Sequence, residues 1–344
     1  MTKPASLVTR AATIACRVNL IGEWIDFNGG TVLPMALAPS ATVQMIANET
    51  ALDRIKSTNF AISQNFSIDA PAHAHWSDYV RGALQYARGR NWIESGQDVS
   101  VESTIPVGAG LSSSAAIIVA TLKAASMGRT DADGAALAFA AKEIENNFIG
   151  VPCGIMDQMA VALGEPGTVL ALDTRDCSYA LLDLPGTWSV AVIHSGVSRA
   201  LSDGRYKVRR DQCIEAAARL GLDYLCDASL LSIAALDAPL LNRARHAISE
   251  AIRSRDAIAA LRSGNRAEFG RLMNESHASL RDDMEVSVPE IDQVVYDAVS
   301  LGADGARITG AGFGGCIVAL VEPQRMDTWW SALKRRHPLV KRIV

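Results

Sequence analysis

Residues 105–116 read IPVGAGLSSSAA and join an alternating apolar pattern at 99–105, typical of a β-strand, to an apolar stretch at 115–128 that is predicted to be helical. Gly108 and Gly110 lack side chains, so their backbone can approach a bulky anion and adopt the positive φ angles that turn successive N–H groups inward. Ser112, Ser113 and Ser114 supply cap oxygens and hydroxyl ligands where the helix dipole favours negative charge. The stretch therefore predicts a phosphate-binding loop.

This loop alone does not identify a function, because glycines also precede helices for structural reasons. It matches neither the Walker pattern nor the dinucleotide GxGxxG pattern with its following acid. A second glycine cluster, TGAGFGG at 309–315, is costly to order and predicts a close approach of backbone to another group. Two glycine loops, together with Asp157 at a predicted helix start, indicate phosphoryl transfer, in which positioning and charge stabilisation provide most of the catalysis.

Composition excludes several other classes of protein. The 344 residues are 20% charged and 49% hydrophobic, which is typical of a soluble globular chain with one large or two medium domains. The net charge of −4 gives no support for a nucleic-acid surface, and the six cysteines lack the spacing of a zinc site or a disulfide framework. No apolar run approaches the ~20 residues that span a bilayer, and the N-terminus lacks a signal-peptide pattern. We expect a cytoplasmic protein that binds neither membrane nor nucleic acid.

Hydrophobic patterns predict a β-rich first hundred residues and a mostly helical chain from Tyr206 onward. This change in composition predicts a boundary near Pro185, with domains at 1–185 and 186–344. Thr130 and Asp131 are the predicted caps of a helix at 132–147. Strands are expected at 13–37 (two, around a turn), 41–47, 54–57, 99–105, 169–173, 180–184, 189–194, 306–309, 316–321 and 340–344. A helix is expected to end within 83–90, and further helices are expected at 115–128, 132–147, 206–220, 240–261, 266–280, 290–301 and 326–336.

Six ordered stretches resemble the galactokinase branch of the GHMP small-molecule kinases. They are RVNLIGEWIDFNGGTVLPMAL (17–37), PVGAGLSSSAA (106–116), PCGIMDQ (152–158), SDGRYKVRRDQC (202–213), ESHASLRDDMEVSVPEID (275–292) and ITGAGFGGC (308–316). The resemblance implies an α+β, two-domain GHMP kinase fold with the active site in the cleft between the domains. It also implies a monomer that uses ATP to phosphorylate the anomeric hydroxyl of a galactose-type sugar.

The resemblance places the catalytic groups at Asp157 and Arg17. Asp157 stands where the family has the acid that takes the proton from the anomeric hydroxyl. Arg17 stands at the family's arginine position, where its permanent charge would favour an ionised Asp157 and offset the charge that develops during transfer. We expect the glycine–serine loop and Asp157 to lie on opposite sides of one phosphorus atom.

The resemblance also assigns the nucleotide and metal sites. Mg²⁺ takes oxygen ligands and retains waters, and Ser114 and Glu145 match the family positions that hold it; Ser113 is an adjacent alternative. The backbone from Gly108 to Ser113 is expected to surround the phosphates. The full set of predicted ATP-binding residues is Pro106, Gly108, Ala109, Gly110, Leu111, Ser112, Ser113, Ser114 and Ala115.

The expected sugar site contains one departure from the family pattern. Glu23 and Asp26 are retained and are expected to hydrogen-bond sugar hydroxyls. Gly154 and Tyr206 match further sugar-contacting positions, and Arg17 and Asp157 complete the set. Trp24 replaces the histidine that faces the exocyclic hydroxymethyl group in the family.

The indole of Trp24 is larger than imidazole and has a single N–H donor. It could stack on the sugar, fill space left by a smaller substrate, or pack in the core. Galactose is the expected substrate, with a galacto-configured sugar altered at that group (L-arabinose or a 6-deoxy sugar) as the alternative. A non-catalytic sensor of sugar and ATP is a less favoured hypothesis, because such relatives tend to lose part of the phosphate loop and the SSSAA segment is intact here.

Overall fold

The computed structural model describes residues 9–48, 50–59, 63–197 and 204–344. Contacts within the chain define two compact units, each built from separate segments. The first unit contains Met1–Arg17, Leu37–Ile105 and Ser112–Gly164, as far as these are described, and the second contains Val18–Ala36, Pro106–Leu111 and Glu165–Val344. The division into domains at 1–185 and 186–344 stays a prediction; the long continuous segment of the second unit begins at Glu165.

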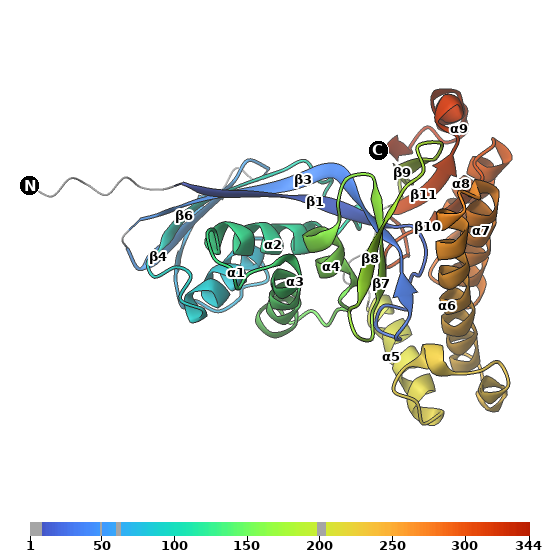
Figure 1. Ribbon diagram of the computed structural model, residues 1–344, viewed down its shortest axis with the longest axis horizontal. Helices are drawn as coiled ribbons and strands as arrows, with labels where there is room; N and C mark the ends of the chain where they lie inside the picture. The colour runs from blue at the N-terminus through green and yellow to red at the C-terminus, as the bar shows by residue number, and fades with distance from the viewer. Residues whose placement is uncertain (1–8, 49, 60–62, 198–203) are drawn as a thin grey trace, which may run out of the picture. The chain divides into compact units, whose positions relative to one another are not determined.

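The first unit contains a β-sheet with helices on one face (Figure 1). β3 pairs with β1 on one side and antiparallel with β6 on the other, β6 pairs in parallel with β4, and β4 pairs antiparallel with β5. The strands are β1 (Arg10–Asn19), β3 (Pro34–Ala47), β4 (Leu52–Ser57), β5 (Ser63–Ser67) and β6 (Gln97–Ser103). The last two residues of β1 and the first three of β3 belong to the second unit. In β3 and β6, Val43, Met45, Val99 and Val101 are buried, which is the alternation that the sequence predicts.

The helices of the first unit pack around α2, whose alanine-rich sequence allows close contact with α1, α3 and α4. The bounds are α1 (Asp78–Gly89), α2 (Ser113–Ala125), α3 (Gly134–Glu143) and α4 (Met156–Leu163). α3 begins later than predicted: its cap is Asp133, which accepts a hydrogen bond from the N–H of Ala136 at 2.8 Å, so the prediction of Thr130 and Asp131 as caps is wrong. α3 continues directly into a π-helical turn at Ile144–Ile149, which replaces the end of the helix predicted at 132–147.

The second unit contains β2 (Thr31–Val32), β7 (Thr168–Asp173) and β8 (Tyr179–Asp183), in which β7 pairs antiparallel with the other two. It also contains an antiparallel sheet in the order β10-β11-β9-β12, with helices α6, α7 and α8 side by side next to it (Figure 1). The strands of this sheet are β9 (Ser189–His194), β10 (Gly305–Ile308), β11 (Cys316–Val321) and β12 (Lys341–Arg342). The helices are α5 (Arg205–Arg219), α6 (Leu240–Arg262), α7 (Arg266–Asp282), α8 (Pro289–Ser300) and α9 (Met326–Arg336).

Two glycines bring α7 against β10. A Cβ atom on Gly270 would lie 2.4 Å from the carbonyl of Asp304, and one on Gly305 would lie 2.2 Å from the carbonyl oxygen of Gly270. Side chains at either position would therefore push the helix off the strand that leads into the second glycine cluster.

Most of the predicted elements are confirmed to within a few residues, and the helix at 326–336 matches its predicted bounds. The closing strand is shorter than predicted and contains only Lys341 and Arg342. No helix in the described ranges combines the length and the apolarity that crossing a bilayer requires.

Candidate active site

Arg17 and Asp157 form an ion pair in the first unit. Arg17 lies in β1 and is 4% exposed, whereas the side chain of Asp157, in the first turn of α4, is 35% exposed. Both Nε and Nη2 of Arg17 donate to the same carboxylate oxygen, Oδ1, at 2.9 and 2.5 Å. The arginine thus holds the carboxylate in place through Oδ1, and the side chain of Asp157 remains part-exposed.

Glu145 lies next to this pair, in the π-helical turn, and is buried. Gln158 Nε2 donates to Glu145 Oε2, the Ser114 hydroxyl also hydrogen-bonds the carboxyl group, and Cys153 Sγ lies 3.8 Å from Oε2. Burial raises the pKa of Glu145, with a smaller contribution from the charge of Asp157, while the hydrogen bonds from Gln158 and Ser114 oppose the rise. Within the described residues, no arginine or lysine forms an ion pair with Glu145.

These residues fit a magnesium site. Mg²⁺ is commonly held by one or two carboxylates, substrate phosphates and waters, and Glu145 and Ser114 offer a carboxylate and a hydroxyl in contact with each other. Gln158 Oε1, in the same cluster, is buried without a hydrogen-bond partner among the described residues. A divalent cation would oppose the effect of burial on Glu145. Of the two serines that the sequence leaves open, the contact with Glu145 favours Ser114 as the ligand.

The predicted phosphate loop has the backbone conformation that its glycines suggest. Gly108 and Gly110 both have φ of +75°, and a Cβ atom on Gly108 would meet no atom within 4 Å, so the backbone conformation rather than packing requires glycine there. Ser112 precedes α2 in the left-handed region (φ +59°). Its hydroxyl does not cap the helix, which corrects the prediction for that residue, and is buried without a partner among the described residues.

Residues 106–111 of this loop belong to the second unit, and Ser112–Ala125 to the first. The expectation that the loop and Asp157 face one phosphorus atom therefore stays a prediction. Within the first unit, the structure brings together Ser114, Glu145 and Asp157.

Trp24 belongs to an aromatic cluster in the second unit. Its ring lies 4.8 Å from that of Tyr206, tilted by 36°, and meets Phe27 edge-on at 6.1 Å. Trp24 is 4% exposed, its φ is +65°, and its Nε1 has no hydrogen-bond partner among the residues described. A buried indole donor without a partner and a left-handed tryptophan are both costly, and such costs concentrate at functional sites.

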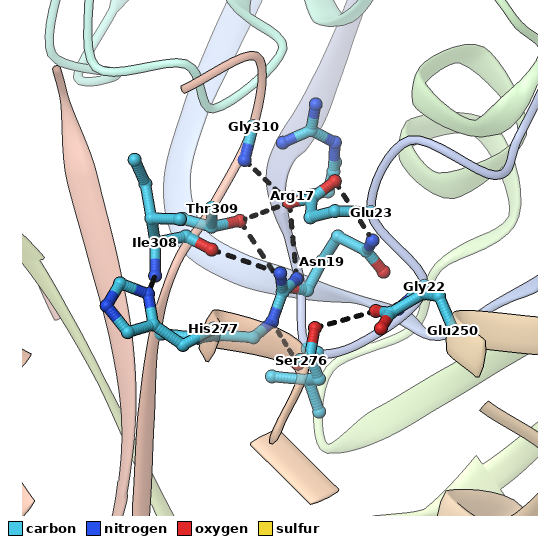
Figure 2. A network of polar contacts seen from close by, with 12 residues as sticks. Arg17, Asn19, Gly22, Glu23, Glu250, Ser276, His277, Ile308, Thr309 and Gly310 are labelled. Carbon is cyan, nitrogen blue, oxygen red and sulfur yellow. Dashed lines mark hydrogen bonds and ion pairs between the residues drawn. The ribbon is translucent and has the colours of Figure 1, made fainter. Parts of the chain in front are cut away.

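Glu23 is held by donors from two segments of the second unit, Asn19 and residues 307–310. Figure 2 shows the Thr309 hydroxyl and the Gly310 N–H directed at Oε1, at 2.8 and 2.6 Å. Asn19 Nδ2 donates to Oε2 at 3.2 Å, and the buried guanidinium of Arg307 lies 3.2 Å from Oε1. Four donors approach the two carboxylate oxygens, so this side chain joins the predicted sugar signature to the second glycine cluster.

A second buried carboxylate supports the same segment. Glu250 accepts hydrogen bonds from the N–H of Gly22 at 2.9 Å and from Ser276 at 2.7 Å (Figure 2). It also pairs with Arg253 at 2.7 Å. Burial alone would raise its pKa, but the charges of Arg253, His246 and Arg307 lower it to about 2. Glu250 therefore stays ionised and holds the backbone next to Glu23.

The predicted sugar-binding residues are divided between the two units. Arg17, Gly154 and Asp157 lie in the first unit, and Glu23, Trp24, Asp26 and Tyr206 lie in the second. Sequence reasoning did not assign roles to Gln158, Glu250, Arg307 or Thr309. Gln158 and Thr309 lie within the quoted motifs, whereas only the contacts in the structure reveal Arg307 and Glu250.

Comparisons with known proteins define the class first. Sequence models of three families match: "GHMP kinases N terminal domain" over residues 78–165, "GHMP kinases C terminal" over 257–338, and "Galactokinase galactose-binding signature" over 8–45. The structure resembles mevalonate kinase from Methanococcus jannaschii with a TM-score of 0.73 at 17% identity, covering 99% of this chain and 98% of the other, which shows a shared fold. These matches define a chain with the GHMP kinase fold.

Nearer relatives define the branch. A galactokinase from Roseiflexus sp. (strain RS-1) is 42% identical over 326 residues, which cover 91% of this chain and 83% of the relative. The crystal structure of Lactococcus lactis galactokinase complexed with galactose gives a TM-score of 0.91 at 30% identity, over 98% of this chain and 92% of the other. The chain belongs to the galactokinase branch of the GHMP kinases and is a sugar 1-kinase with their mixed α+β fold. The predictions of family, fold class and enzyme class are confirmed.

Proposed function

We propose that this sugar kinase uses ATP to phosphorylate the anomeric hydroxyl of D-galactose, with Asp157 as the base. The single observation that carries the base assignment is the ion pair with Arg17: two of its nitrogens donate to Asp157 Oδ1, and the carboxylate remains part-exposed. The names of the Roseiflexus and Lactococcus relatives support galactose as the substrate.

In the proposed reaction, the carboxylate of Asp157 accepts the proton of the anomeric hydroxyl as the anomeric oxygen bonds to the γ-phosphorus. The bond from the γ-phosphorus to the bridging oxygen breaks, and ADP leaves with that electron pair. Arg17, whose charge is permanent, offsets negative charge at the transferred group and keeps Asp157 in position. A bound Mg²⁺, held by Ser114 and Glu145, would supply charge neutralisation at the nucleotide phosphates.

The phosphate loop binds the nucleotide in this proposal. The residues from Pro106 to Ala115 present backbone N–H groups and serine hydroxyls, and the positive φ angles of Gly108 and Gly110 support this role. The buried hydroxyl of Ser112, which has no partner among the described residues, can donate to a phosphate oxygen.

For the sugar, Glu23, Trp24, Asp26, Gly154 and Tyr206 are the proposed contacts. Glu23 already accepts from several protein donors, so its remaining acceptor capacity limits it to one sugar hydroxyl. The packing of Trp24 favours a second candidate substrate. Its buried indole packs on Tyr206, which suits a galacto-configured sugar without the exocyclic hydroxyl, such as L-arabinose or a 6-deoxy sugar.

The test is ADP release with ATP and Mg²⁺ across a panel of hexoses and pentoses, on the parent protein and on Trp24→His. Galactose should give the highest kcat/KM for the parent if the first proposal holds. A preference for L-arabinose that Trp24→His shifts toward galactose would favour the second. No turnover of any sugar would contradict both.

Asp157→Ala tests the base. It should lose turnover by at least 1,000-fold while ADP still binds, because general-base catalysis and positioning are both lost. Asp327→Ala is the matched control, since Asp327 is 95% exposed and makes only a 3.6 Å ion pair with Arg342. Undiminished turnover of Asp157→Ala would remove Asp157 from its role.

A further inference from the structure

We propose that Gln158 is a positioning residue for the metal site: its amide N–H fixes Glu145, and its carbonyl oxygen accepts a hydrogen bond from a water bound to the cation. This inference rests on the proposed magnesium site. It assigns a role to a buried side chain next to Asp157 that the reaction described above does not use.

The amide of Gln158 is oriented by its two donors. Gln158 is 0% exposed, on α4, and its Nε2 donates to Glu145 Oε2 and lies 3.3 Å from Cys153 Sγ. A primary amide has two N–H groups, and these contacts use both. The reversed amide would set its carbonyl oxygen against Glu145 Oε2, whereas the observed orientation places an N–H donor on that oxygen.

Cys153 is held in turn, which makes the arrangement rigid. Its N–H donates to Asn146 Oδ1 at 3.1 Å, and its Sγ lies 3.6 Å from the same oxygen. Asn146 and Glu145 are neighbours in the π-helical turn, so the turn supplies the carboxylate and also anchors the cysteine that contacts Gln158. π-Helical turns within helices occur frequently at functional sites.

The carbonyl oxygen of Gln158 is left without a donor. Oε1 is buried and has no hydrogen-bond partner among the described residues, although buried acceptors in folded proteins are almost always paired. A purely structural glutamine would be expected to satisfy its acceptor as well as its donors. The free acceptor lies in the same cluster as the proposed ligands Ser114 and Glu145. Because Mg²⁺ retains several waters, a coordinated water is a donor of suitable chemistry.

The experiment measures binding of Mn²⁺, a spectroscopically visible substitute for Mg²⁺, to the protein–ADP complex by the electron paramagnetic resonance signal of free Mn²⁺. Gln158→Met removes both the donors and the acceptor at similar volume, and we expect Mn²⁺ binding to weaken by about 10- to 100-fold, as for other partners of metal ligands. Gln158→Glu keeps an acceptor oxygen and should bind Mn²⁺ at least tenfold more tightly than Gln158→Met. Gln97→Met is the matched control, because Gln97 is also buried in the first unit and its amide donates to the Ser95 carbonyl at 3.0 Å.

Two outcomes would overturn the inference. One is Mn²⁺ binding by Gln158→Met within threefold of the parent, which would leave Gln158 a space-filling role. The other is equal weakening in Gln158→Met and Gln158→Glu, which would show that only the lost N–H contact with Glu145 matters and that the carbonyl oxygen has no part in binding. If Gln158→Met needs a higher Mg²⁺ concentration for half-maximal turnover than the parent and its KM for the sugar is unchanged, the inference gains independent support. If the parent binds Mn²⁺ with ADP but phosphorylates no sugar, the proposed function fails while the inference is still decided by binding.

Discussion

Replacing Thr309 by valine tests whether the buried carboxylate of Glu23 is held by the second glycine cluster. The substitution keeps the shape of the side chain and removes one hydroxyl, which donates to Glu23 Oε1 at 2.8 Å and also lies 3.3 Å from the Asn19 carbonyl. Thr309 is fully buried, so no water replaces the lost donor without rearrangement.

The expected cost follows from these contacts. Hydrogen bonds to a charged group contribute ~1.5–3 kcal/mol. After the substitution, Oε1 of Glu23 still contacts the Gly310 N–H at 2.6 Å and the Arg307 guanidinium at 3.2 Å, so it loses one donor and keeps two. We therefore expect Thr309→Val to lower the free energy of unfolding by about 2 kcal/mol. Since Glu23 is a proposed sugar contact, the KM for the sugar should also rise while the KM for ATP stays unchanged.

Thr174→Val is the control because it removes a buried hydroxyl bonded to a neutral acceptor. Thr174 Oγ1 donates to the Gly30 carbonyl at 2.8 Å in the same unit, and its loss should cost ~1 kcal/mol. Urea unfolding, followed by tryptophan fluorescence and circular dichroism with coincident transitions, measures both variants. A loss for Thr309→Val no larger than for Thr174→Val would refute the reasoning, because the charge of Glu23 would then contribute nothing.

Three further predictions concern the ion pair, the cation and pH. Arg17→Lys keeps the charge but loses the two-nitrogen contact with Asp157, so kcat should fall about 100-fold with ADP affinity retained in a titration. Ser114→Ala removes a proposed ligand and should raise the Mg²⁺ concentration for half-maximal turnover about tenfold without changing the KM for the sugar. Burial lowers the pKa of His246 below 6.5, so the unfolded chain takes up the proton at a higher pH than the folded chain does. The free energy of unfolding should therefore fall as the pH drops below 6.5. His246→Asn should make that decline smaller when urea unfolding is measured between pH 8 and pH 5.5.

The fold could be predicted largely because its elements carry local signals. The strand at 316–321 and the helix at 326–336 have the bounds that their hydrophobic patterns predict, so the tertiary contacts of these elements agree with their local sequence preferences. The errors occur where local signals compete. Asp133 rather than Thr130 or Asp131 caps α3, and the π-helical turn departs from the regular period that the sequence pattern assumes.

Residues of the candidate site could be predicted only where they lie in or near a recognisable sequence motif. Asp157, Glu145 and Ser114 lie in or near recognisable stretches, and the structure places them in one cluster. The supports were not predictable in the same way. Arg307 donates to the carbonyls of Asn19 and Leu20, nearly three hundred residues away in the chain, and no local pattern distinguishes it from a surface arginine.

Two of the carboxylate groups of the candidate site therefore have different surroundings. Asp157 is part-exposed and is held by Arg17 through Oδ1, an arrangement suited to a group that must accept and release a proton. Glu23 is buried and accepts from donors on two segments, Asn19 and residues 307–310, an arrangement suited to a group that must not move. Because Glu23 is held by protein donors and is also a proposed sugar contact, substitutions at Glu23 should change stability and sugar affinity together. Substitutions at Asp157 should lower turnover, and they also cost stability because the buried guanidinium of Arg17 loses this carboxylate partner.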